Sequence, residues 1–305
     1  MAINRFHTPD FSLRQLQYAV AIVETGGFGK AAQLCGVSQP SLSAQLAKLE
    51  DVLGVALFDR EARGATLTAE GEHLLEAMRA TLRAAAALET EATCLGDPYA
   101  LPVTVAVIPT VAPYLLPHVV RRLKEGERHP LVHWRELQTA DAEQALAEGE
   151  VDAVVIADPP VDPRMASVDL GWDAFLAVLP AHEEGPAELS VEWLADRDVL
   201  LLEDGHCLRD HVITLCRRPG AKESPYRATS LPTLVQMVAA GLGASVLPSV
   251  SAAVESRRAD IRLYPFPADS GIGRTLRMAW RPGFHRKVVL DDVASAFRRA
   301  LSDCT

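Results

Sequence analysis

Two cysteines that lie nine positions apart, Cys207 and Cys216, are the residues in this sequence best suited to redox chemistry. The run that holds them reads as the start of a helix. Nine helical residues at about 100° each place the two thiols on roughly opposite faces, about 13 Å apart. A disulfide requires Cα atoms within about 7 Å of each other. The pair therefore cannot bond while the helix is intact, and a bond between them would act as a switch.

Composition limits the class of protein that could carry such a pair. The chain has 305 residues, of which 49% are hydrophobic and 23% charged, as is usual for a globular protein of two or three domains. Its five cysteines are too few and too scattered for a disulfide scaffold. The sequence shows neither a secretory signal nor an apolar run long enough for a membrane span. We expect a cytoplasmic protein without membrane contact.

Charge is distributed unevenly along the chain. The net charge is −10, but residues 1–66 hold six Lys/Arg and six Asp/Glu and are neutral, so the excess negative charge lies beyond them. A neutral N-terminal segment that binds DNA must do so through local geometry and dimerisation more than through bulk charge.

The N-terminal segment predicts a winged helix-turn-helix. One helix begins at Ser12, a short helix runs over 28–34, and Ser38 caps a third helix after a glycine turn. This order of elements places a recognition helix in the major groove of DNA. Two short strands, 55–58 and 65–68, would enclose a wing. The candidate DNA contacts are Ser38, Gln39, Pro40, Ser41, Ser43, Gln45, Lys48, Arg60 and Arg63.

Beyond this segment the pattern changes twice. A long helix from Thr68 to about Cys94 has one modest apolar stripe, which indicates a partner helix. Strands then alternate with helices, which predicts βαβ units and a parallel sheet. We expect a DNA-binding domain at 1–67, a linker helix at 68–97 and an α/β domain at 98–305, with subdomain I at about 98–172 and 275–305 and subdomain II at about 173–274.

The N-terminal motifs resemble LysR-type transcriptional regulators. The runs Phe28–Ala32, Val37–Ser43 and Leu57–Arg60 carry this resemblance, together with Leu67-Thr68 and Gly71. It implies an α/β effector domain of two subdomains, like periplasmic binding proteins, behind a mainly α winged helix-turn-helix and a linker helix. It also implies double-stranded promoter DNA, RNA polymerase and further copies of this chain, as dimer or tetramer, as partners. No cofactor and no enzymatic activity are expected, and activation and repression both stay open.

A second resemblance is narrower. The run Leu201–Asp210, then Cys216 and Arg227–Leu231, resembles the peroxide-sensing members of that family. It implies that hydrogen peroxide oxidises Cys207, the peroxidatic cysteine, and that Cys216 resolves the sulfenic acid to a disulfide. A helix N-terminus and nearby cations would favour the reactive thiolate. The implied supporting residues are Thr110, Thr139, His206, Arg209 and Asp210.

Other functions stay open. The cysteines would be incidental in a LysR-type regulator that senses a small metabolite in the cleft between the subdomains. A thiol peroxidase with an accessory DNA-binding domain is a further alternative, for which the sequence offers no reductase docking site. His206, Cys207 and His211 lie close together, but their spacing matches no zinc motif, so we expect no metal.

Overall fold

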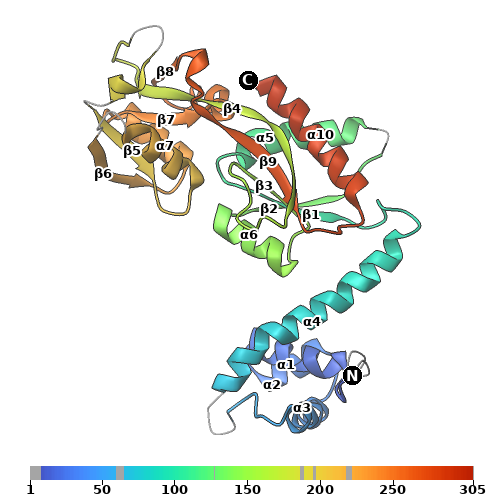
Figure 1. The fold of residues 1–305 in the computed structure, drawn as a ribbon. Helices are drawn as coiled ribbons and strands as arrows, with labels where there is room; N and C mark the ends of the chain where they lie inside the picture. The colour runs from blue at the N-terminus through green and yellow to red at the C-terminus, as the bar shows by residue number, and fades with distance from the viewer. Residues whose placement is uncertain are drawn as a thin grey trace. The chain divides into compact units, whose positions relative to one another are not determined.

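The chain folds into two compact units, Met1–Thr93 and Cys94–Thr305 (Figure 1). The computed structural model describes residues 8–59, 65–126, 128–185, 189–194, 197–217 and 222–304. None of the helices among these residues is both long and apolar enough to cross a bilayer.

The N-terminal unit is built from four helices whose ends are set by local capping. Ser12 and Gln15 form a reciprocal capping box before the first helix, and Gly26 ends it in the left-handed conformation with φ of 68°. Ser38 accepts a hydrogen bond from the Ser41 N–H and caps the third helix. These predicted boundaries are confirmed. The helices are α1 (Leu13–Thr25), α2 (Phe28–Leu34), α3 (Gln39–Leu53) and α4 (Ala69–Cys94).

A buried carboxylate fixes α3 to the segment that follows it. Glu50 is only 9% exposed, and its Oε1 accepts hydrogen bonds from the N–H groups of Leu57 (2.7 Å) and Phe58 (3.3 Å). Phe58 in turn forms an antiparallel bridge with Leu67. In the described part of the predicted wing, this bridge stands where two short strands were expected.

The second unit contains two lobes that share long strands. In the first lobe β1 pairs in parallel with β2 and β3, and β9 pairs antiparallel with β3 and with the long strand β4. Both β4 and β9 continue toward the second lobe, where β4 pairs with β7 and β8 (Figure 1). These strands are β1 (Val103–Val107), β2 (Val132–Glu136), β3 (Ala153–Ile156), β4 (Ala166–Pro180), β7 (Ser245–Pro248), β8 (Ile261–Pro265) and β9 (Gly273–Trp280).

The second lobe adds a parallel pair of strands, β5 (Asp198–Leu202) and β6 (Lys222–Ala228). A bridge between Val199 and Ala244 joins β5 to the chain just before β7, and the Ser245 hydroxyl donates to the Leu200 carbonyl at 2.8 Å. Helix α7 (Cys207–Arg217) packs on β5 and on the 3₁₀ turn η2 (Val191–Leu194). The strand β5 therefore positions the helix that carries both cysteines.

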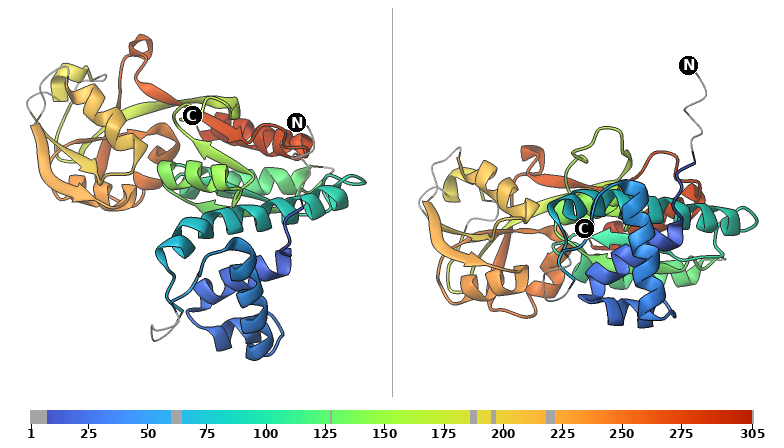
Figure 2. Two further views of the ribbon diagram at one scale, coloured as in Figure 1. Left: turned by 60° about the horizontal axis from the view of Figure 1, so that its bottom comes forward. Right: turned by 90° about the horizontal axis from the view of Figure 1, so that it is seen from below.

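Helices cover the sheet on both sides. Helix α10 (Lys287–Cys304) packs against β4 and against helix α5 (Ala112–Glu125) (Figure 2). Helix α6 (Thr139–Glu148) packs on β3. Helix α8 (Leu231–Ala239) contacts the strands of the second lobe. Helix α9 (Ser249–Glu255) touches both α5 and α10, and the 3₁₀ turn η3 (Ala268–Ser270) precedes β9.

Several expectations need correction. The sheet is mixed, because only β1, β2 and β3, and separately β5 and β6, are parallel, whereas β4 and β9 run antiparallel. Strand β4 is 15 residues long and pairs with β9, β7 and β8 in turn. The elements β6, α9 and β8 were not predicted. Each of these elements depends on partners distant in sequence, which residue periodicity does not reveal.

The hydrogen bonds that Glu50 accepts predict that its substitution loosens the segment after α3. In Glu50→Ala the amides of Leu57 and Phe58 lose their buried acceptor, which costs about 1–3 kcal/mol. Hydrogen–deuterium exchange of the peptide that spans 55–59 should accelerate strongly. Asp51→Ala, on the exposed side of the same helix, is the matched control. Equal exchange in the two variants would contradict the assigned role of Glu50.

Candidate functional site

Cys207 is the first residue of α7 and lies beside the start of α6. Gly205 permits this approach: its φ is +95°, and a Cβ there would stand 2.1 Å from the Gln138 Oε1 atom. Gln138 immediately precedes α6, and Thr139 is the first residue of that helix. The Thr139 hydroxyl is buried without a hydrogen-bond partner among the described residues. It faces Cys207 closely enough to lower the pKa of the thiol.

Burial raises the pKa of the Cys207 thiol above its ordinary value. The positive charge of Arg274, the Thr139 hydroxyl and the Leu208 N–H act in the opposite direction, whereas the Asp158 carboxylate adds to the increase. Burial is the largest of these effects. The Leu208 N–H at the start of the helix and the positive charge of Arg274 do favour the thiolate, but burial outweighs them in this conformation.

Arg274 belongs to a buried network. Its Nε donates to Asp173 Oδ2 at 3.0 Å, and both side chains are 0% exposed. Its Nη1 donates to the Thr110 hydroxyl at 2.8 Å and its Nη2 to the Thr110 carbonyl at 3.2 Å. Thr110, one of the expected supporting residues, therefore holds the cation that opposes the effect of burial on Cys207.

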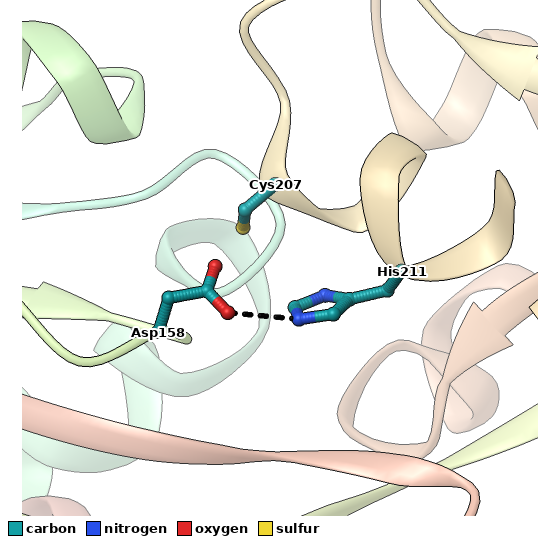
Figure 3. A group of neighbouring side chains, drawn as sticks. All are labelled: Asp158, Cys207 and His211. Carbon is teal, nitrogen blue, oxygen red and sulfur yellow. Dashed lines mark hydrogen bonds and ion pairs between the residues drawn. The ribbon is translucent and has the colours of Figure 1, made fainter. Parts of the chain in front are cut away.

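A carboxylate, a thiol and an imidazole come together at this site. The ligand atoms of Asp158, Cys207 and His211 all lie within 4.8 Å of one another. Figure 3 shows the thiol and the Nε2 side of the imidazole turned toward the Asp158 carboxylate. Oδ1 of Asp158 lies 2.9 Å from His211 Nε2, and this hydrogen bond holds the pKa of Asp158 below its usual value. The His211 ring also packs against Phe175, with centroids 5.8 Å apart.

The remaining expected supporting residues lie around this cluster. His206 is buried, and its carbonyl accepts from the Arg209 N–H at 2.9 Å in the first turn of α7. Arg209 forms ion pairs with Asp204 (3.2 Å) and with the exposed Asp210 (3.7 Å). Among the described residues neither Arg209 nor Asp210 bonds to the Cys207 thiol. The charged pair thus lies at the surface of α7, while Thr110 and His206 are buried and Thr139 is half-buried.

The two cysteines occupy opposite ends of α7. Cys207 begins the helix and carries a free thiol. Cys216 is the second-last residue of the helix, which ends at Arg217. The helix is thus intact across the whole interval, as the sequence predicted. At 1.5 Å per residue, the Cα atoms lie about 13 Å apart along the helix axis, beyond disulfide range.

Sequence reasoning missed three residues of this site: Asp158, Asp173 and Arg274. Asp158 follows β3, and the other two face each other in the register of β4 and β9. The sequence held only a weak signal for these residues. Each is a charged residue within or just after a strand, and a charged group that is buried there needs a partner.

The other candidate site is the outer face of α3. Ser38, Gln39, Pro40, Ser41 and Lys48 are exposed, which leaves them available to a duplex. Ser43 is half-buried, and Gln45 is half-buried and accepts a hydrogen bond from Gln15 Nε2 at 3.2 Å. Gln45 therefore also fixes α3 to α1. Arg60 and Arg63 lie outside the described residues.

A cavity adjoins α7 on the side of His211. Its volume is about 380 Å³, within the range of small-molecule pockets. Its lining combines apolar side chains such as Phe175 and Ile272 with the polar side chains of Glu192, His211 and Thr214.

Comparison with known proteins identifies the family. Residues 98–302 match the LysR substrate binding domain, and residues 13–72 match the bacterial regulatory helix-turn-helix proteins of the lysR family. The chain is 35% identical to the hydrogen peroxide-inducible genes activator of Haemophilus influenzae, over 93% of this chain and 95% of the relative. It is 36% identical to the DNA-binding transcriptional dual regulator OxyR of Escherichia coli K12, over 94% and 95%.

Solved structures agree with these relatives. A full-length OxyR variant from Pseudomonas aeruginosa matches with a TM-score of 0.73 and 33% identity, covering 96% of each chain. A hydrogen peroxide-bound OxyR variant from Corynebacterium glutamicum matches with a TM-score of 0.66 and 34% identity, over 98% of this chain and 94% of the other. The chain therefore belongs to the LysR family of bacterial helix-turn-helix regulators, which are DNA-binding regulators of transcription and not enzymes.

Proposed function

We propose that this chain is a transcription regulator that senses hydrogen peroxide through Cys207 and binds promoter DNA through α3. The observation that carries this proposal is the position of Cys207. Cys207 begins a helix, and its thiol lies near the Thr139 hydroxyl, the imidazole–carboxylate pair of His211 and Asp158, and the buried guanidinium of Arg274. Such groups can hold a peroxide and transfer the protons that its cleavage requires. The names of the relatives support the same substrate.

The proposed chemistry has two steps. The Cys207 thiolate attacks one oxygen of hydrogen peroxide, the O–O bond breaks, and the departing hydroxide takes a proton to become water. The sulfenic acid formed on Cys207 is then attacked by the Cys216 thiolate, which releases a second water and leaves a disulfide. Two thiols are oxidised and one peroxide is reduced to two waters. His211 would donate the first proton, which the Thr139 hydroxyl could relay.

The second step requires α7 to unwind, because its two ends cannot meet in the helix. Closure of a loop this short contributes about 2–3 kcal/mol by restricting the open chain. The loss of helical packing is of comparable size, so the two states can lie near balance. In the dimer or tetramer, the change would pass from the effector part (98–305) through the linker helix (68–97) to the DNA-binding part (1–67), and so to RNA polymerase on cytoplasmic DNA.

A second candidate function rests on the cavity beside α7. A small metabolite bound among Phe175, His211 and Thr214 would act on the same helix without any thiol chemistry. The cavity lies within the expected subdomain II and not in the cleft between subdomains. Oxidation of Cys207 by peroxide distinguishes peroxide sensing from metabolite sensing.

Mass spectrometry after micromolar peroxide should detect a Cys207–Cys216 crosslink. In Cys216→Ser the reaction should stop at a Cys207 sulfenic acid, which a dimedone probe would trap. Cys304→Ser, which changes a half-buried thiol at the end of α10, should behave as wild type. Unmodified Cys207 at a peroxide dose that alters transcription would exclude this mechanism and favour the metabolite.

The raised pKa of Cys207 predicts a steep pH dependence of oxidation. Below that pKa the thiolate fraction grows about tenfold per pH unit, so the rate constant for peroxide should rise without a plateau from about pH 7 to pH 8.5. Thr139→Val removes a group that lowers the pKa and should slow oxidation at pH 7 while the slope persists. Stopped-flow or quenched-flow kinetics measure both effects.

Thr214→Val, an exposed position on the same helix, is the matched control for the hydroxyl and should leave the rate unchanged. A plateau that begins below pH 8 would indicate a stabilised thiolate and contradict the assigned effect of burial.

The exposed position of Lys48 on α3 predicts a contact with phosphate. Lys48→Ala should weaken binding to a mixed-sequence duplex and reduce the slope of log affinity against log salt by about 0.9. Lys124→Ala, on α5 of the other unit, removes one positive charge as Lys48→Ala does and serves as the control. Fluorescence anisotropy over a salt series gives both slopes, and identical slopes for the two variants would refute the contact.

A further inference from the structure

We propose that Asp158, Cys207 and His211 form a reversible Zn²⁺ site that joins the two lobes of the effector unit. The ligand atoms of the three side chains already lie within 4.8 Å of one another, and Figure 3 shows them converging on one point. Zinc–ligand bonds of about 2.0–2.3 Å separate tetrahedral ligand atoms by about 3.3–3.8 Å. Adjustments of less than about 1 Å per side chain would produce that spacing, and water would take the fourth position.

The donor set selects the ion. A thiolate, an imidazole and a carboxylate are the three ligand types that zinc accepts together. Mg²⁺ and Ca²⁺ prefer oxygen donors alone, and Cu(I) prefers sulfur and imidazole without a carboxylate. Zinc would displace the proton of the Cys207 thiol, so that one proton is released to solvent for each ion bound. The side chains of Asp158 and His211 are 43% and 24% exposed, which gives the ion a route from solvent.

The three ligands come from different parts of the unit. Cys207 and His211 lie one turn apart on α7, whereas Asp158 follows β3 in the other lobe, 53 positions before His211. Spacing along the chain predicted no metal because Asp158 lies far in sequence from the two ligands on α7. An ion bound to all three would fix the first turn of α7 to the β3 lobe. It would therefore stabilise the helical form of α7, which keeps Cys207 and Cys216 apart.

If the proposed function holds, zinc would also protect the sensor. A sulfur bound to the ion is less free to attack peroxide, and a helix fixed at its first turn is less able to unwind. Zinc occupancy would then lower the rate of Cys207 oxidation and raise the peroxide dose needed for crosslinking. This regulatory effect rests on the proposed function, whereas the binding site itself does not.

Zinc binding is tested with the reduced full-length chain and Zn²⁺ alone, in competition with a chromogenic chelator. Wild type should bind one ion that is lost in Cys207→Ser. Asp158→Asn, which keeps the shape of the side chain, and His211→Gln, which removes the imidazole, should each weaken binding more than about tenfold. Co²⁺ in place of zinc should give a thiolate-to-metal charge-transfer band that the same three variants lose. His118→Gln, a change on α5 away from the site, should retain both signals.

The outcomes separate this inference from the proposed function. Absence of stoichiometric binding, or binding that survives in both Asp158→Asn and His211→Gln, would overturn the zinc site. Peroxide oxidation of zinc-free Cys207 would still stand in either case. Conversely, zinc binding with an inert metal-free Cys207 would support the site and refute peroxide sensing. Circular dichroism of each variant confirms that loss of binding is not loss of fold.

Discussion

The buried ion pair between Asp173 and Arg274 is the interaction on which the effector unit depends. The two residues face each other across β4 and β9, the strands that run through both lobes. Asp173 Oδ1 accepts from the Ser249 hydroxyl at 3.0 Å and from the Val250 N–H at 3.2 Å, where α9 begins. Arg274 reaches Thr110, between β1 and α5. A charged pair is tolerated in an interior only when hydrogen bonds satisfy it in this way.

This pair also sets the electrostatics of the thiol. Arg274 is the main positive charge acting on Cys207, and the ion pair with Asp173 holds it in place. Burial raises the pKa of the Cys207 thiol more than the guanidinium lowers it. The raised pKa of the thiol favours its protonated form, so a proton acceptor beside the sulfur, such as the Asp158–His211 pair, gains importance. A buried, protonated thiol is also less exposed to indiscriminate oxidation.

The sequence predicts features that depend on neighbouring residues. It predicts much less of what depends on contacts between residues far apart in the chain. Helix caps at Ser12 and Ser38 were predicted because the capping atoms lie within three residues of each other. Cys207 and Thr139 were proposed from motifs that resemble those of a known family. Asp158 and Arg274 were not, because the groups that give them a role come from other strands and helices. The mixed sheet was missed for the same reason, because the residue pattern of a strand such as β9 does not reveal the direction of the strands beside it.

The intact helix between Cys207 and Cys216 has a consequence for timing. On the proposed mechanism, sulfenic acid forms on a helix whose unwinding is a separate event with its own rate. The lifetime of the intermediate is then set by how often α7 opens, and not by the peroxide concentration. Brief exposures would leave sulfenic acid that reductants can reverse, and only exposures longer than the opening time would lock the disulfide. The stability of eleven residues of helix would thus act as a filter on signal duration.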